Sequence, residues 1–144
     1  MSNVYEGGIP HMTMANVTDT RTRPALSKRI PLRPFIYICS RYRGNTERNA
    51  ADALRYCRFA VSRGCVPIAP HIFYAHSGIL DDADPAERKL GIQFGIALLN
   101  CCNEIWLFGK HFSEGMMREY NSAVSRNIRA RFFTEDCVEI DRFK

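Results

Sequence analysis

The chain lacks any long hydrophobic run. No apolar stretch among its 144 residues approaches the roughly 18 residues that a membrane-spanning helix needs. The first residues also lack the basic and then apolar pattern of a secretory signal peptide. We therefore expect a cytoplasmic protein that does not bind a membrane.

Signature motifs for metals and common cofactors are also missing. The six cysteines form no CxxC pair and share no repeated spacing, which favours packed thiols over a disulfide framework or a zinc site. Neither GxxxxGK[ST] nor GxGxxG occurs, so the sequence has no Walker A loop and no dinucleotide fingerprint. We expect no metal and no other cofactor.

Strong charge of one sign is confined to the first residues. The formal net charge is +5, but residues 34–144 carry fifteen Lys/Arg against thirteen Asp/Glu, and residues 1–33 carry five against two. A nearly balanced body argues against a dedicated nucleic-acid surface, which is usually a basic stripe. Binding of nucleic acid through the basic tail is the weaker alternative.

Residues 1–33 differ in composition from the rest of the chain. They are rich in Thr, Asn, Arg, Gly and Pro and show no sustained periodicity, so we predict a flexible basic tail. One interpretation of the pair His11-Met12 is a cloning remnant ahead of a start at Met12 or Met14. Residues 34–144 have the length of one ordinary domain.

Short apolar segments alternate with amphipathic ones along this domain. Strands are predicted at residues 35–39, 65–69, 104–108 and 131–133, with a further one at 138–140. Strands that alternate with helices of this length indicate βαβ units. We predict a single flavodoxin-like or Rossmann-like α/β domain of about five parallel strands, with helices on both faces of the sheet.

Three helices are predicted from their capping residues. The first begins after Asn45, the second after Asp84 with Pro85 at its first position, and the third after Ser113. The stripe that the second helix is predicted to bury consists of Leu90, Phe94, Ala97, Leu98 and Cys101. The corresponding stripe of the third consists of Met116, Tyr120, Ala123, Val124 and Asn127. The apolar second helix can serve either the core or a contact with another copy.

Candidate ligand-binding residues gather in three loops, because ligands of open parallel sheets bind beyond the carboxyl ends of the strands. The first loop, residues 40–45, places Arg41 and Arg43 beside Gly44 just before a helix. Fixed positive charge together with free backbone N–H groups at a helix start suits a phosphate. Two solvated surface arginines are the alternative.

The second loop, residues 70–84, is rich in histidine and aspartate. Its spacing matches no zinc or EF-hand pattern, and Asp84 is better explained as a helix cap. Asp82 or Asp81 is instead a candidate acid beside a substrate oxygen or a base edge. A plain surface loop remains possible on this pattern.

The third loop leads into a helix that carries Glu119. At 100° per residue this glutamate lies roughly 60° from Met116 and about 40° from Ala123, so its carboxylate flanks the apolar stripe. A half-buried glutamate near a helix start at a strand's carboxyl end is well placed to act as a nucleophile. A structural ion pair with Arg118 or Arg126 is the competing interpretation.

Residues 113–123 read S-x-G-M-x-x-E-x-N-x-A, which resembles the motif D-x-G-T-x-x-E-x-G-x-A of the nucleoside 2-deoxyribosyltransferases, whose glutamate is the nucleophile. The related 2′-deoxynucleoside 5′-monophosphate N-glycosidases are more similar still. They share the serine and glycine ahead of the glutamate and a first loop C-x-x-x-R-G, matched here by residues 39–44. Uncharacterised phage and bacterial proteins with Y-I-C-S-x-Y-R-G, A-P-H and S-x-G-M-x-x-E are also similar. The likeness covers about residues 35–133.

This resemblance implies a role for each matching residue. Glu119 is expected to be the nucleophile, Arg43 and Ser113 to hold a 5′-phosphate, and Asp82 to orient the sugar or protonate the leaving base. The other residues expected to bind substrate are Ser40, Arg41, Tyr42, Gly44, His71, Gly115 and Met116. The resemblance also implies a homodimer or a larger homo-oligomer.

The implied activity is hydrolysis of the base–sugar bond of a nucleoside monophosphate through a covalent glycosyl–glutamate intermediate. Three positions depart from the transferase motif: Ser113 replaces Asp, Met116 replaces Thr and Asn121 replaces Gly. Transfer between free nucleosides is therefore less expected than hydrolysis. The other alternative is a non-catalytic protein that binds or sequesters a nucleotide, although such a protein has no need of Glu119.

Overall fold

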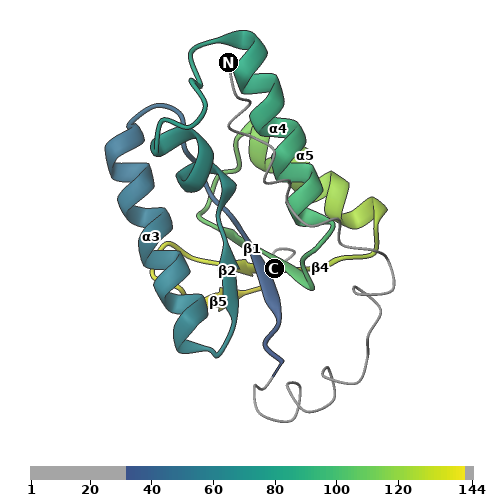
Figure 1. The fold of residues 1–144 in the computed structure, drawn as a ribbon. Helices are drawn as coiled ribbons and strands as arrows, with labels where there is room; N and C mark the ends of the chain where they lie inside the picture. The colour runs from purple at the N-terminus through teal and green to yellow at the C-terminus, as the bar shows by residue number, and fades with distance from the viewer. Residues whose placement is uncertain (1–31, 142–144) are drawn as a thin grey trace, which may run out of the picture. The chain divides into compact units, whose positions relative to one another are not determined.

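A five-stranded sheet forms the centre of the domain in the computed structural model, which describes residues 32–141 (Figure 1). The strands are β1 (Phe35–Cys39), β2 (Val66–Ile68), β3 (Glu104–Phe108), β4 (Arg129–Phe133) and β5 (Glu139–Ile140). Their order in the sheet is β2-β1-β3-β4-β5. The predicted α/β fold, with its flavodoxin-like arrangement of about five strands, is confirmed.

One strand departs from the predicted parallel arrangement. The pairs β1–β2, β1–β3 and β3–β4 are parallel, whereas β4 and β5 pair antiparallel. Only residues 134–138 separate β4 from β5, a length that permits a hairpin but no parallel crossover. Within this turn, the amide of Thr134 donates to the carbonyl of Val138.

The helices begin at the predicted caps. They are α3 (Thr46–Ser62), α4 (Pro85–Leu99) and α5 (Glu114–Ser125), and a π-helix, η1 (His71–His76), lies between β2 and α4. The side chains of Asn45, Asp84 and Ser113 accept hydrogen bonds from the first-turn amides of α3, α4 and α5, respectively. Each cap therefore satisfies a backbone donor that the helix itself leaves without an acceptor.

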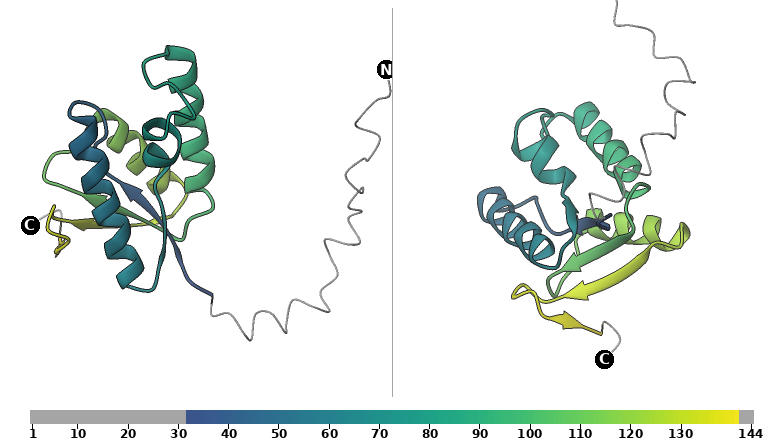
Figure 2. Two further views of the ribbon diagram at one scale, coloured as in Figure 1. Left: turned by 60° about the vertical axis from the view of Figure 1, so that its left-hand side comes forward. Right: turned by 60° about the horizontal axis from the view of Figure 1, so that its bottom comes forward.

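Helices cover both faces of the sheet, as predicted (Figure 2). On one face α3 packs through Tyr56 and Ala60 against Ile36, Ile38 and an aromatic cluster from β3 and β4. On the other face α4 and α5 bury a second cluster of residues, which comprises Tyr37, Cys39, Leu99, Cys102, Ile105, Leu107, Met116 and Ala123. Alternate residues of β1 thus belong to opposite clusters.

The predicted buried stripe of α4 is wrong. The buried residues of this helix are Gly95 and Leu99, whereas Leu90 and Phe94 are 42% and 38% exposed. Apolar residues occur on every side of α4, so periodicity alone does not select the face that meets the sheet. The close approach of Gly95 to the ring hydroxyl of Tyr37 selects it instead.

Two further predictions need correction. Val124 is 52% exposed, and Asn127 lies beyond the end of α5 with a positive φ of 58°, so neither belongs to the buried stripe. Residues 71–76 of the predicted loop 70–84 are helical, as η1. The predicted tail, residues 1–33, lies outside the described residues except for Leu32 and Arg33.

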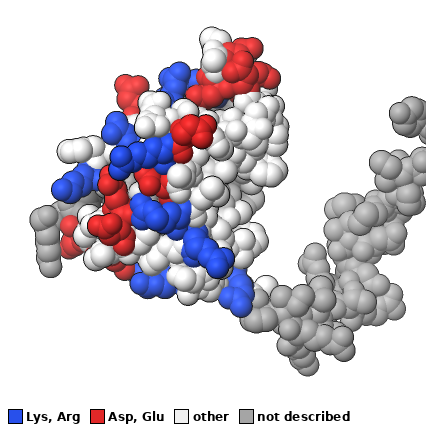
Figure 3. Space-filling model, turned by 90° about the vertical axis from the view of Figure 1, so that its left-hand side faces the viewer, with Lys and Arg blue, Asp and Glu red and all other residues white. Residues whose placement is uncertain are grey.

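The surface over α3 carries charges of both signs. Figure 3 shows basic and acidic side chains interleaved on this face. Arg48 and Arg55 both pair with Asp52, at 3.9 and 3.3 Å. Within residues 32–141, no helix is long and apolar enough to cross a membrane, and no group of three His, Cys, Asp or Glu side chains is placed to hold a metal ion. The six cysteines are free thiols.

Candidate functional site

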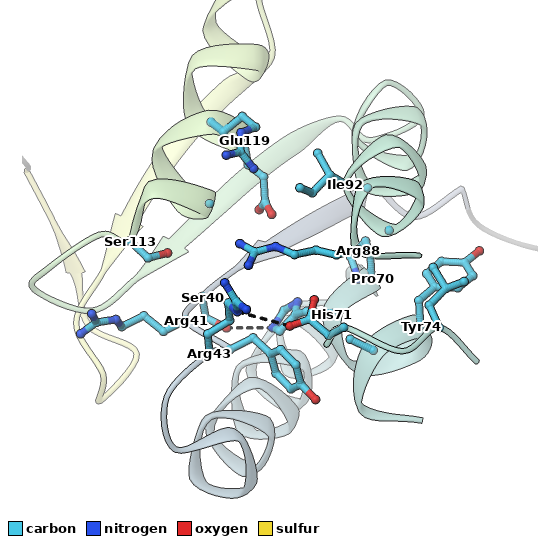
Figure 4. A pocket seen from close by; sticks show the side chains of 18 of the residues that line it. Ser40, Arg41, Arg43, Pro70, His71, Tyr74, Arg88, Ile92, Ser113 and Glu119 are labelled. Carbon is cyan, nitrogen blue, oxygen red and sulfur yellow. Dashed lines mark hydrogen bonds and ion pairs between the residues drawn. The ribbon is translucent and has the colours of Figure 1, made fainter. Parts of the chain in front are cut away.

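A cavity of about 440 Å³ lies at the carboxyl ends of the parallel strands. Its walls are the loop after β1, the helix η1, one side of α4 and the first turns of α5 (Figure 4). The three loops singled out from the sequence therefore meet at one place. Parallel strands bring them together because their carboxyl ends all lie at the same edge of the sheet.

The cavity collects nearly all of the predicted site residues. Those that line it are Ser40, Arg41, Tyr42, Arg43, Gly44, His71, Asp82, Ser113, Gly115 and Glu119. Met116 is the exception, because it is 2% exposed and packs in the core between α5 and the sheet. Met116 and Ala123, seven residues apart, share the core-facing side of α5, so the predicted substrate contact of Met116 is corrected to a packing role.

Glu119 points its carboxylate into the cavity from α5 (Figure 4). Burial raises the pKa of this carboxyl from 4.5 to about 7, and hydrogen bonds from Cys39 and Tyr37, with the charge of Arg118, oppose the rise. A carboxyl with this pKa exists in both forms near neutral pH. The sequence-based interpretation of Glu119 as a half-buried group is consistent with this environment.

Tyr37 and Cys39 support the carboxylate from β1. Burial, and then the charge of Glu119, raise the pKa of both groups well above their ordinary values, so both keep their protons and act as donors to Glu119. Residues 37 and 39 share one face of the strand because side chains alternate. Sequence analysis missed Tyr37, although a tyrosine within an otherwise apolar buried strand is a signal that its hydroxyl needs a partner.

Ser40 and His71 form a hydrogen-bonded pair in the floor of the cavity. The Ser40 Oγ and His71 Nε2 atoms are 3.1 Å apart. Burial lowers the pKa of His71 to about 4, so its ring is neutral at physiological pH and can either donate to the serine hydroxyl or accept from it. Tyr42 packs edge-on against this ring, with centroids 6.2 Å apart.

An ion pair joins the first loop to the second. The Arg43 Nε and Asp82 Oδ2 atoms are 3.4 Å apart, and the two side chains are 61% and 31% exposed. At this exposure the pair contributes little to stability, on the order of 1 kcal/mol or less. It does place a cation and a carboxylate side by side at the rim of the cavity.

The wall formed by α4 was not anticipated. Its lining residues are Glu87, Arg88, Gly91, Ile92, Gly95 and Ile96. Together with Pro70, Tyr74 and Leu80, this side of the cavity is largely apolar. The sequence analysis assigned none of these α4 residues, Arg88 included, to the site. The available signal was the recurrence of Gly91 and Gly95 one turn apart, which leaves an open strip along a helix.

The fold and this site define an α/β protein with a ligand cavity at the switch between β1 and β3. Among solved structures, a "2-desoxiribosyltransferase from Leishmania mexicana" is similar, with a TM-score of 0.51 and 16% sequence identity. The similarity covers 70% of this chain and 64% of that chain, and it shows a shared fold. The chain belongs to the family described as "Domain of unknown function (DUF7768)", whose sequence model matches residues 34–133. No curated protein matches the chain.

Proposed function

We propose that this protein cleaves the N-glycosidic bond of a nucleoside 5′-monophosphate, with Glu119 as the nucleophile. The observation that carries the proposal is the carboxyl of Glu119, half-buried at the edge of a cavity that arginines also line. The structural relative named a 2-desoxiribosyltransferase has the same fold, and its name refers to transfer of a deoxyribosyl group. A site of that chemistry needs a carboxylate at the sugar.

The cavity offers complementary walls to a nucleotide. Its volume of about 440 Å³ lies within the usual range of small-molecule sites. On one side, the loop of residues 40–44 and the start of α5 present arginines, hydroxyls and backbone N–H groups that suit a phosphate. On the other side, Pro70, Tyr74 and Ile92 offer apolar surface to the flat face of a base.

The proposed reaction is a double displacement at the anomeric carbon. A carboxylate oxygen of Glu119 bonds to C1′ while the C1′–N bond breaks, and the bonding electron pair leaves with the base, which takes up a proton. Water then attacks C1′, the ester bond to Glu119 breaks, and the proton lost by water restores the proton balance. The products are free base and sugar 5-phosphate, and Glu119 returns as a carboxylate.

Tyr37 and Cys39 serve the first step by donating to the carboxylate, because these bonds favour its charged form against burial. Asp82 is proposed to orient the sugar or to protonate the leaving base. Its contact with Arg43 favours the first of these roles, since a carboxylate paired with a cation readily accepts a hydrogen bond from a sugar hydroxyl. Ser113 caps α5, and its hydroxyl hydrogen is still available to a phosphate oxygen.

The test is a panel of the four 2′-deoxynucleoside 5′-monophosphates and their ribose counterparts, incubated with the protein and analysed for free base. The Glu119→Gln variant should lose activity by orders of magnitude while it still binds, because it keeps the shape of the side chain and removes its charge. Glu135→Gln, at an exposed residue outside the cavity, is the matched control.

A 2-fluoro-2-deoxy nucleotide provides an independent test, since it slows breakdown of the intermediate. It should leave a glycosyl adduct on the peptide that contains Glu119, detectable by mass spectrometry. An added second base should not appear in a new nucleotide if the reaction is hydrolysis. An adduct on another peptide, or full turnover by Glu119→Gln, would overturn the assignment of Glu119 as the nucleophile. Binding of nucleotides without release of base from any of them would favour a nucleotide-binding protein.

A further inference from the structure

Arg88 reaches into the cavity from the α4 wall (Figure 4). It lies one turn before Ile92 and two before Ile96, so all three belong to the helix side that lines the cavity. The side chain is half-buried, and its guanidinium extends past the apolar wall toward the side from which Glu119 and Ser113 project. Its charged end is therefore held inside the site and not at the outer surface of the helix.

Four arginines line the cavity, and their guanidinium groups have different surroundings. Arg43 is paired with Asp82, whereas Arg41 and Arg118 are exposed. No hydrogen bond or ion pair within residues 32–141 engages the side chain of Arg88. A guanidinium is charged at every accessible pH and carries five N–H donors. Because no protein acceptor in the described residues occupies these donors, they are available to a ligand in the cavity that supplies acceptors.

We propose that Arg88 binds the phosphate of the substrate from the α4 side, opposite the loop of residues 40–44. This inference rests on the proposed function and adds a cation from another wall of the cavity to its phosphate site. Phosphate suits the fork of a guanidinium because two parallel N–H donors match two of its oxygens. Held between Arg88 and Arg43, a phosphate bridges two walls of the cavity and fixes the sugar in front of Glu119.

The test measures binding in the Glu119→Gln background, where turnover does not interfere. Arg88→Met should weaken binding of a 2′-deoxynucleoside 5′-monophosphate by about 10- to 150-fold, and binding of the same nucleoside without phosphate by less than about twofold. Arg88→Lys should fall between, since it keeps the charge and loses the fork. Lys89→Met, at the exposed neighbour on α4, should change neither.

Equal losses for nucleotide and nucleoside in Arg88→Met would overturn the inference and place the guanidinium at the base or sugar. Unchanged binding of both ligands would overturn it as well. Competition by inorganic phosphate is a second measurement: it should displace the nucleotide from the Arg88-containing protein much more readily than from Arg88→Met. Release of free base by the unmodified protein is measured separately. If the nucleotide binds through Arg88 but no base is released, the proposed function is wrong and the phosphate-binding role of Arg88 is still supported.

Discussion

A Cβ atom on residue 95 would lie 3.0 Å from the hydroxyl oxygen of Tyr37. Glycine at this position lets α4 pass close above the hydroxyl that hydrogen-bonds to Glu119. We therefore expect Gly95→Ala to push Tyr37 away from the carboxylate and to lower kcat by at least about tenfold, the loss of roughly one hydrogen bond to a charged group. Steady-state kinetics with the best nucleotide of the panel measures this effect.

Gly91→Ala is the matched control for that substitution. A Cβ there would meet only Leu80 Cδ1, at 3.5 Å, which is an ordinary contact. Because alanine is the better helix former, this variant should gain about 0.5–1 kcal/mol of stability and leave the position of Tyr37 unchanged. If both variants behave alike, the contact between residue 95 and Tyr37 has no role in catalysis.

The activity should depend on pH through the ionisation of Glu119. Its pKa of about 7 means that the nucleophile is mostly protonated in acid, so kcat/KM should rise with pH, with a midpoint at about 7, and level off about one unit higher. His71, with a pKa of about 4, does not titrate in this range. Tyr37→Phe removes a donor to the carboxylate and should move the midpoint upward. An unshifted midpoint in that variant would show that Tyr37 does not tune Glu119.

Glu119→Gln should make the protein more stable above pH 7. The folded-state pKa of about 7 exceeds the ordinary 4.5, so the buried charge costs nothing below pH 4.5 and its cost is complete above pH 7. At full ionisation the buried charge lowers the free energy of unfolding by roughly 3 kcal/mol. The neutral amide of the Glu119→Gln variant causes no such loss. Urea unfolding of both proteins between pH 4 and 8 tests this difference. A variant that is less stable at pH 8 would indicate a structural ion pair instead.

His71 should have the opposite dependence. Its folded-state pKa of about 4 lies below the ordinary 6.5, so the folded state loses up to roughly 3 kcal/mol as the pH falls from 6.5 to 4. His71→Gln should not show this loss. Its free energy of unfolding, relative to that of the parent, should therefore increase as the pH falls. His111→Gln, at an exposed histidine outside the cavity, is the control.

Arg43→Ala should discriminate between nucleotides and nucleosides. Loss of a charge-assisted contact to phosphate should raise KM for monophosphates by about 10- to 150-fold and leave KM for nucleosides nearly unchanged. Arg48→Ala is the control, because Arg48 is exposed on α3 and pairs with Asp52 away from the cavity. Equal effects of Arg43→Ala on both substrates would show that Arg43 does not bind the phosphate.

Local chemistry allowed much of the fold to be predicted. The strand at residues 104–108 was placed at its observed bounds, and Asn45, Asp84 and Ser113 cap the helices that they were expected to start. A cap is a hydrogen bond between residues two or three positions apart, so its signal lies entirely within a short segment. Alternation of strands and helices then restricts the topology to a few parallel arrangements.

Tertiary packing decided which side of each helix meets the sheet and which residues share the cavity. On α4 it buried Gly95 and left Phe94 exposed, and on α5 it directed Met116 into the core beside Glu119. A helix with apolar residues on every side has no preferred face until a partner surface exists. Likewise, Tyr37 and Glu119 are 82 positions apart in the sequence. Only the parallel sheet, which aligns the carboxyl ends of distant strands, makes them neighbours. Burial at this place raises the pKa of the carboxyl on which the proposed chemistry depends, and the Tyr37 hydroxyl opposes that rise.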